Sequence, residues 1–166
     1  MERYVSVTRT GKAEVYEEII PQLESLLEGE SDPTANLANT TAVLKMAFPA
    51  RVSWVGFYLL KGGELVLGPF QGKPACVRIG MGKGVCGTAA KRRETIIVPD
   101  VDQFPGHIAC DPDSRSEIVV PLIWDDELVG VLDLDSPQTA TFDETDRRYL
   151  ERIRTIILRA LGSYKH

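Results

Sequence analysis

Apolar residues recur at helical spacing in three segments of the chain. In residues 12–28 they follow one another at steps of four, four, three and one, at Val15, Ile19, Leu23, Leu26 and Leu27. We expect Pro21 to kink or divide this helix, because its ring cannot continue a preceding helical turn. Further helices are predicted over residues 34–47 and 143–161. The last helix has two candidate N-caps, Thr141 and Asp143.

Runs rich in β-branched and aromatic residues, bounded by Gly, Pro and Asp turns, predict strands between these helices. The strands cover residues 52–60, 64–67, 76–79, 95–98, 117–124 and 127–135. A glycine-rich turn leads into a short helix over residues 85–91. Two helices, then strands around a short helix, then a final helix predict an α+β domain built on an antiparallel sheet.

Composition narrows the class of protein. The 166 residues suit a single domain, and 43% of them are hydrophobic, as in ordinary globular proteins. The net charge of −5 without a basic run disfavours nucleic-acid binding. No apolar run is long enough for a membrane span, and no secretory leader is visible, so we expect a cytoplasmic protein. The glycines of residues 80–84 lack the spacing of a phosphate-binding loop.

Two acidic residues end an apolar strand. The period of two places four side chains on one face, Val129, Val131, Asp133 and Asp135, and Leu132 and Leu134 on the other. Glu117 opens the neighbouring predicted strand and could join the two aspartates. If all three point into water they are ordinary strand ends. If they share a pocket, their mutual repulsion raises at least one pKa, which suits a proton donor or a seat for an ammonium group.

The three cysteines are candidates for thiol chemistry. Cys110 lies in a loop over residues 102–116 that has no clear period, where a nucleophile and a buried apolar side chain are equally good interpretations. His107 precedes it by three residues. Cys86 begins a short helix, whose N-terminus favours a lower thiol pKa, although packing explains it as well. The spacings between Cys76, Cys86 and Cys110 match no zinc knuckle, but they suit a cycle of attacking and resolving thiols.

Trp54 and Tyr58 share the same strand parity, with Gly56 between them. The two aromatic rings therefore point to one face of the predicted sheet, and the glycine leaves room beside them. They either pack in the core or line a pocket on that face.

Several segments together resemble a GAF domain over residues 36–160. They are Trp54–Tyr58, Gly82–Ala90, Ile97–Val101, Glu117–Leu122 and Gly130–Ser136. Within GAF domains, Phe104–Asp111 followed by Ser116–Pro121 is similar to the free methionine-(R)-sulfoxide reductases, and all three cysteine positions of that family are filled. The resemblance implies one GAF domain over residues 1–166, of which residues 1–35 form an N-terminal helical segment. It also implies a sheet with the N- and C-terminal helices on one face and a ligand pocket on the other.

The resemblance further implies an activity, the reduction of free L-methionine-(R)-sulfoxide with thioredoxin as reductant. Cys110 would be the catalytic thiol, passing through a sulfenic acid to an intramolecular disulfide. Cys76 would be the main resolving thiol, and Cys86 an accessory thiol able to form an alternative disulfide. The implied substrate-binding residues are Glu117, Asp133, Asp135, Trp54 and Tyr58. No metal or cofactor is implied, and the activity would counter oxidative stress.

Other functions remain open from the sequence. A GAF domain can bind a small molecule without turnover, and a fold alone does not fix a function. A thiol protein that consumes peroxide and a structural subunit with inert thiols are further alternatives. The N-terminal helix could also build a homodimer interface.

Overall fold

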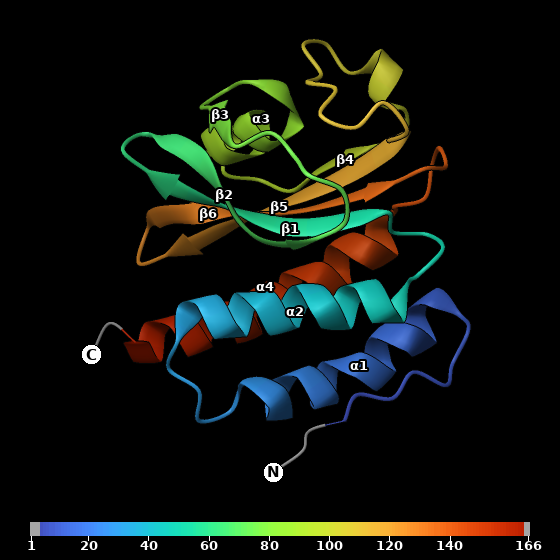
Figure 1. Ribbon diagram of the computed structural model, residues 1–166, viewed down its shortest axis with the longest axis vertical. Helices are drawn as coiled ribbons and strands as arrows, with labels where there is room; N and C mark the ends of the chain where they lie inside the picture. Colours follow the sequence, from blue (N-terminus) through green and yellow to red (C-terminus); the bar gives the residue numbers. More distant parts are fainter. Residues whose placement is uncertain (1–3, 165–166) are drawn as a thin grey trace.

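The computed structural model describes residues 4–164 as one α+β unit (Figure 1). Its elements are α1 (Lys12–Leu27), α2 (Pro33–Ala47), β1 (Trp54–Lys61), β2 (Glu64–Gln71), β3 (Arg78–Gly80), α3 (Gly84–Arg92), β4 (Ile96–Val98), the 3-10 turn η1 (Val101–Gln103), β5 (Ser116–Trp124), β6 (Glu127–Ser136) and α4 (Glu144–Tyr164). The strands form one antiparallel sheet in the order β3-β2-β1-β6-β5-β4. None of the helices in the described residues is long and apolar enough to cross a bilayer.

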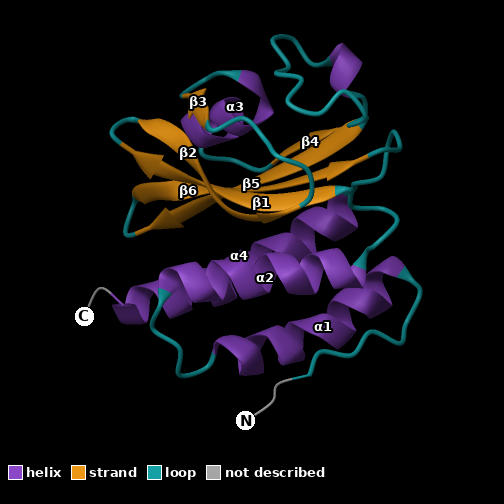
Figure 2. Ribbon diagram, in the orientation of Figure 1, coloured by secondary structure: helices purple, strands orange, loops and turns teal. Residues whose placement is uncertain are grey.

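The helices divide unequally between the two faces of the sheet (Figure 2). Helices α2 and α4 pack directly on one face, and α1 packs on these two helices as an outer layer. The main hydrophobic core fills this side. Helix α3 and the segment that follows β4 lie over the other face, with a smaller core beneath them. The predicted α+β architecture, with terminal helices on one face, is confirmed.

Pro21 does not divide α1, contrary to one of the two outcomes predicted from the sequence. The helix is continuous from Lys12 to Leu27. Pro21 lies on the exposed face of the helix, where water can satisfy the carbonyl group that loses its hydrogen bond. The buried side chains of the opposite face hold the helix in place, among them Tyr16, Ile19 and Leu23.

A register shift corrects the predicted faces of β6. Leu122 pairs with Gly130 and Ile123 pairs with Leu128, so Val129 is an extra residue between the two pairs. The bulge turns Val129 toward the helix-side core, whereas the period of two predicted it beside Asp133. Beyond the bulge the prediction is confirmed: Val131 packs on the α3 side and Leu132 on the helix side.

A buried carboxylate ties α1 to α4. Asp143 caps α4 by accepting a hydrogen bond from the Thr145 N–H at 2.9 Å, and Asp146 accepts one from the Asp143 N–H. This reciprocal arrangement resembles a capping box. Of the two predicted N-caps, Asp143 is therefore the one that caps the helix, and Thr141 is not. Asp146 also accepts bonds from Lys12 Nζ at 2.7 Å and from the Tyr16 hydroxyl at 2.6 Å.

Replacing Asp146 with alanine is expected to lower the free energy of unfolding by about 3 kcal/mol, because it leaves Lys12 and Tyr16 without their buried partner. Urea denaturation followed by circular dichroism measures the effect. Glu28→Ala, at the exposed end of α1, is the matched control and should change stability by less than about 0.5 kcal/mol. An equal effect of the two substitutions would contradict a structural role for the network.

Candidate active site

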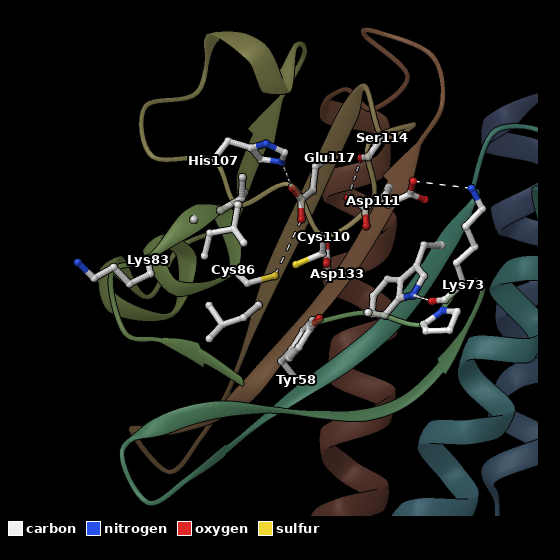
Figure 3. Close-up of a pocket in the computed structure, with 18 residues that line it drawn as sticks. Tyr58, Lys73, Lys83, Cys86, His107, Cys110, Asp111, Ser114, Glu117 and Asp133 are labelled. Atoms are coloured by element: carbon white, nitrogen blue, oxygen red, sulfur yellow. Dashed lines mark hydrogen bonds and ion pairs between the residues drawn. The ribbon is translucent and has the colours of Figure 1, made fainter. Parts of the chain in front are cut away.

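A pocket opens on the sheet face that faces α3 (Figure 3). Strands β1, β5 and β6 form its floor, α3 forms one wall, and the segment between η1 and β5 covers it. The enclosed space is about 50 Å³. The loop that sequence analysis singled out supplies His107, Ile108, Cys110, Asp111 and Ser114 to the lining.

The sheet register gathers the three predicted acids on the pocket floor. Glu117 and Asp135 are direct cross-strand partners in β5 and β6, and Asp133 lies two residues along β6 on the same face. Glu117 is 6% exposed and Asp133 is 5% exposed. Ser114 Oγ donates to Asp135 Oδ1 at 3.3 Å. The interpretation of these residues as solvated strand ends is therefore wrong.

Burial raises the pKa of all three carboxyl groups. For Glu117 and Asp135 the rise is large, and the negative charge of Asp133 adds to it. For Asp133 itself, burial raises the pKa, and the neighbouring polar groups of Glu117 and Cys86 oppose that rise. The cluster therefore keeps protons to a higher pH than exposed carboxyl groups do, which suits it to donate a proton.

Glu117→Gln is expected to stabilise the fold at neutral pH. The folded state holds the Glu117 proton above the pH at which the unfolded chain loses it, so stability falls as pH rises through that interval. A glutamine has no proton to lose, and the variant should exceed the wild type at pH 8 by more than the roughly 0.5 kcal/mol typical of surface changes. The difference should shrink below about pH 4. Thermal denaturation across this range measures it, and a constant difference at every pH would contradict it.

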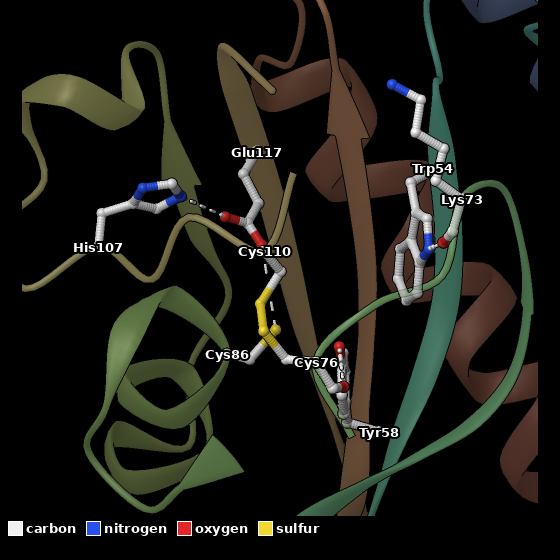
Figure 4. Close-up of a disulfide and its surroundings, with 8 residues drawn as sticks. All are labelled: Trp54, Tyr58, Lys73, Cys76, Cys86, His107, Cys110 and Glu117. Atoms are coloured by element: carbon white, nitrogen blue, oxygen red, sulfur yellow. Dashed lines mark hydrogen bonds and ion pairs between the residues drawn. A yellow bond between two sulfur atoms is a disulfide. The ribbon is translucent and has the colours of Figure 1, made fainter. Parts of the chain in front are cut away.

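Cys76 and Cys110 form a disulfide at the edge of the pocket (Figure 4). Their Cα atoms are 5.6 Å apart although 34 residues separate them in the sequence. Cys76 lies before β3, which begins at Arg78 rather than at residue 76 as predicted. The irregular segment between β2 and β3 brings Cys76 to the covering loop, and the Tyr58 hydroxyl donates to the Cys76 carbonyl at 2.9 Å.

Cys86 remains a free thiol inside the protein. It is the third residue of α3, and its Sγ donates to Glu117 Oε2 at 3.9 Å. Burial, and then the charges of Asp133 and Glu117, raise the pKa of this thiol well above its ordinary value. The lowered pKa that the helix N-terminus suggested is therefore wrong, because burial among acids outweighs the helix dipole.

His107 reaches the acidic cluster from the covering loop. Its Nε2 atom lies 3.8 Å from Glu117 Oε1. Burial lowers the pKa of the imidazole, with an opposing contribution from Asp102. A neutral imidazole can take up a proton, but across this distance a proton passes between the two groups only through a bridging water molecule. The sequence placed His107 near Cys110 along the chain, but the structure places it against Glu117.

Trp54 and Tyr58 line the pocket, and their ring centroids are 6.0 Å apart. The Trp54 indole N–H donates to the Lys73 carbonyl at 3.1 Å. Gly56 leaves the space that the rings require, since a Cβ there would lie 2.5 Å from the Trp54 ring and from Phe70 Cβ. Phe70 stacks on Trp54 at 5.4 Å, and the sequence missed it because β2 was predicted to end at residue 67.

Two other lining residues were also missed. Ser114 contacts Asp135, and Lys73 pairs with Asp113 at 2.9 Å and with Asp111 at 3.8 Å. These residues lie on irregular segments where no periodicity indicates which way a side chain points. The sequence offered no signal for either of them beyond the unusual length of the loop.

The fold and pocket define a class of protein. Residues 32–161 match the GAF domain family, and the chain belongs to it. Within that family, the free methionine-R-sulfoxide reductase of Escherichia coli is 46% identical over 142 residues, covering 86% of each chain. That of Saccharomyces cerevisiae is 44% identical over 153 residues, covering 88% of this chain and 85% of the relative.

A solved structure agrees with these relatives. Free methionine-R-sulfoxide reductase from Neisseria meningitidis, in complex with its substrate, is 49% identical with a TM-score of 0.96. The match covers 99% of this chain and 98% of that chain. The chain therefore belongs to the free methionine-R-sulfoxide reductases, which confirms the family that the sequence motifs predicted.

Proposed function

We propose that the protein reduces free L-methionine-(R)-sulfoxide to methionine. One observation carries the proposal: the Cys76–Cys110 disulfide lies at the edge of a pocket floored by three acids, of which Glu117 and Asp133 are buried, in a chain of this family. A binding module needs neither a reducible bond at its pocket nor acids that retain their protons.

The acidic floor accounts for the choice of a free amino acid. The α-ammonium group of the substrate would pair with Asp133, Asp135 or Glu117, whereas a peptide nitrogen carries no charge. Trp54 and Tyr58 would hold the methylthio end, because apolar and aromatic walls suit that group. The loop over residues 102–116 covers part of the pocket, and a peptide would have to continue past it on both sides of the substrate.

The proposed first step oxidises Cys110 at the expense of the sulfoxide. The thiolate attacks the substrate sulfur and forms an S–S bond, while a carboxyl group of the cluster protonates the oxygen, which leaves as water. Water then attacks the Cys110 sulfur, the S–S bond breaks, methionine leaves in its reduced form, and Cys110 becomes a sulfenic acid. Burial raises the pKa of Glu117, which makes it the carboxyl group best suited to supply this proton.

In the second step, the Cys76 thiol condenses with the sulfenic acid, giving a disulfide and water. A dithiol carrier such as thioredoxin then exchanges with this disulfide and leaves both cysteines reduced. Exposed apolar side chains flank the bond, Val77 beside Cys76 and Ile108 near Cys110, and they offer a surface for such a carrier. This cycle suits a reducing, cytoplasmic setting and a part in the response to oxidative stress.

Cys86 has an accessory part in this proposal, as a thiol that can form an alternative disulfide with Cys110. Cys86 is a free thiol while Cys76 and Cys110 are joined, which supports an accessory rather than a main resolving role. We also keep the prediction that two copies of the protein form a homodimer through the outer helix α1.

Consumption of NADPH in a thioredoxin-coupled assay tests the function. Free L-methionine-(R)-sulfoxide should support turnover, its S epimer should not, and an N-acetylated R epimer should react far more slowly. Turnover of peroxide without turnover of the sulfoxide would favour a peroxide-consuming thiol protein. Binding of the sulfoxide without any NADPH consumption, with the thiols confirmed as reduced, would favour a non-catalytic binding module.

A further inference from the structure

Cys86 is not part of the disulfide, and its thiol lies near the carboxyl groups of Glu117 and Asp133 (Figure 3). Three possible ligand atoms lie within 4.8 Å of one another: the Cys86 sulfur, one carboxylate oxygen of Glu117 and one of Asp133. The three side chains come from α3, β5 and β6, and all of them are buried. They therefore form a compact set of one sulfur and two oxygen donors, held by three different elements of the fold.

One oxygen of this set has no partner. Glu117 is within reach of Cys86 and His107, and Asp135 accepts a bond from Ser114. Asp133 Oδ1, in contrast, is buried without a hydrogen bond to any described residue, and its carboxyl group faces Glu117 and Cys86. An unpaired buried acceptor is costly, and a cation bound at this point would satisfy it.

The donor set favours a particular kind of cation. An ammonium group needs only oxygen acceptors, and Mg²⁺ and Ca²⁺ also prefer oxygen ligands. A thiolate with two carboxylates suits a borderline-soft divalent ion, for which zinc is the common example. We propose that Cys86, Glu117 and Asp133 form a Zn²⁺-binding site, with water in the fourth position, when Cys76 and Cys110 are joined as a disulfide.

The space and the reach of the side chains fit an ion. The enclosed volume of about 50 Å³ has room for a metal ion and a few water molecules. Ligand atoms around tetrahedral Zn²⁺ lie about 3.5 Å apart, so the set must close by roughly 1 Å at its widest separation. The pocket is partly open to solvent, so an ion can enter it.

Binding would change no oxidation state. The Cys86 S–H bond breaks, a Zn–S bond forms, and the proton passes to solvent, as does any proton held by the two carboxyl groups. Water molecules leave the ion as the three side chains replace them. The spacing of the cysteines excludes a zinc knuckle, which is built from several thiols, but it allows a mixed site of one thiol and two carboxyl groups from different elements.

The disulfide form isolates this site, because Cys86 is then the one free thiol among the three cysteines of the chain. Titration calorimetry with Zn²⁺ should give one ion per chain with release of protons. Co²⁺, used as a spectroscopic substitute, should give the ultraviolet charge-transfer band of a cobalt–thiolate bond. Cys86→Ser should abolish that band and weaken Zn²⁺ binding at least about 10-fold, and Asp133→Asn should weaken binding by a similar factor.

Asp113→Asn is the matched control, since it removes an exposed carboxylate outside the cluster and should leave Zn²⁺ affinity unchanged. Thermal denaturation confirms that each variant is folded. Lack of the cobalt–thiolate band in the wild type would overturn the proposal. So would equal Zn²⁺ affinity in the wild type and the folded Cys86→Ser and Asp133→Asn variants. Neither sulfoxide nor thioredoxin is present, so the outcome does not depend on the proposed reductase activity.

Discussion

Cys110→Ser is expected to abolish steady-state reduction of free L-methionine-(R)-sulfoxide, with a loss on the order of 10³-fold or more in kcat. A serine hydroxyl at this position is neither ionised at neutral pH nor able to form the sulfenic acid that carries the oxygen away. Binding of the substrate should survive, because the acids and aromatic rings of the pocket are unchanged. The thioredoxin-coupled assay measures the first effect and calorimetry the second.

Cys76→Ser provides the matched comparison. It should release about one methionine per chain in a rapid first turnover and then stop, because the attacking thiol is present but the resolving thiol is missing. Quenched-flow measurement of methionine separates this burst from steady turnover. If the Cys110→Ser variant kept full steady-state activity, Cys110 would be excluded as the nucleophile. Full activity of Cys76→Ser with thioredoxin would show that another thiol, such as Cys86, resolves the intermediate.

Asp133→Asn is expected to lower kcat/KM for the free sulfoxide on the order of 10²-fold. Asp133 is buried and has an acceptor oxygen without a partner, so the arriving ammonium group would satisfy it. An asparagine keeps the shape of the side chain but loses the charge. The discriminating measurement is the ratio of kcat/KM for the free substrate to that for its N-acetylated form, which should fall toward one in the variant.

Asp102→Asn is the control for this effect, because Asp102 is an exposed acid outside the lining of the pocket. It should change the ratio by less than about 2-fold. A loss in Asp133→Asn that is equal for the free and the N-acetylated substrate would mean that Asp133 acts on the sulfoxide end rather than on the ammonium group.

Much of the fold could be predicted because regular elements carry a period. The apolar spacing of α1 and α4 and the β-branched runs of β5 and β6 define both the elements and their buried faces. The sequence predicted that Asp133 and Asp135 lie on the same face of the sheet, because side chains two positions apart in a strand point the same way. That Glu117 faces Asp135 was a suggestion from the predicted hairpin, and the register of β5 and β6 confirms it.

The errors fall where a period is broken or where distant contacts decide. Val129 was placed on the wrong face because a bulge adds one residue, and no local pattern marks it. The high pKa of Cys86 depends on acids from two strands that follow it in the chain. The sequence also offered no sign that His107 lies beside Glu117, because the two residues become neighbours only in the folded chain.

The small volume of the pocket in the disulfide form determines an order of events. About 50 Å³ is far below the several hundred Å³ of sites that enclose a small organic ligand, so we expect the oxidised protein to admit another sulfoxide only after a carrier reduces it. Each catalytic cycle would then alternate strictly between two partners that never occupy the protein together. Such an enzyme follows ping-pong kinetics: double-reciprocal plots at different carrier concentrations are parallel, and excess sulfoxide does not trap the oxidised form.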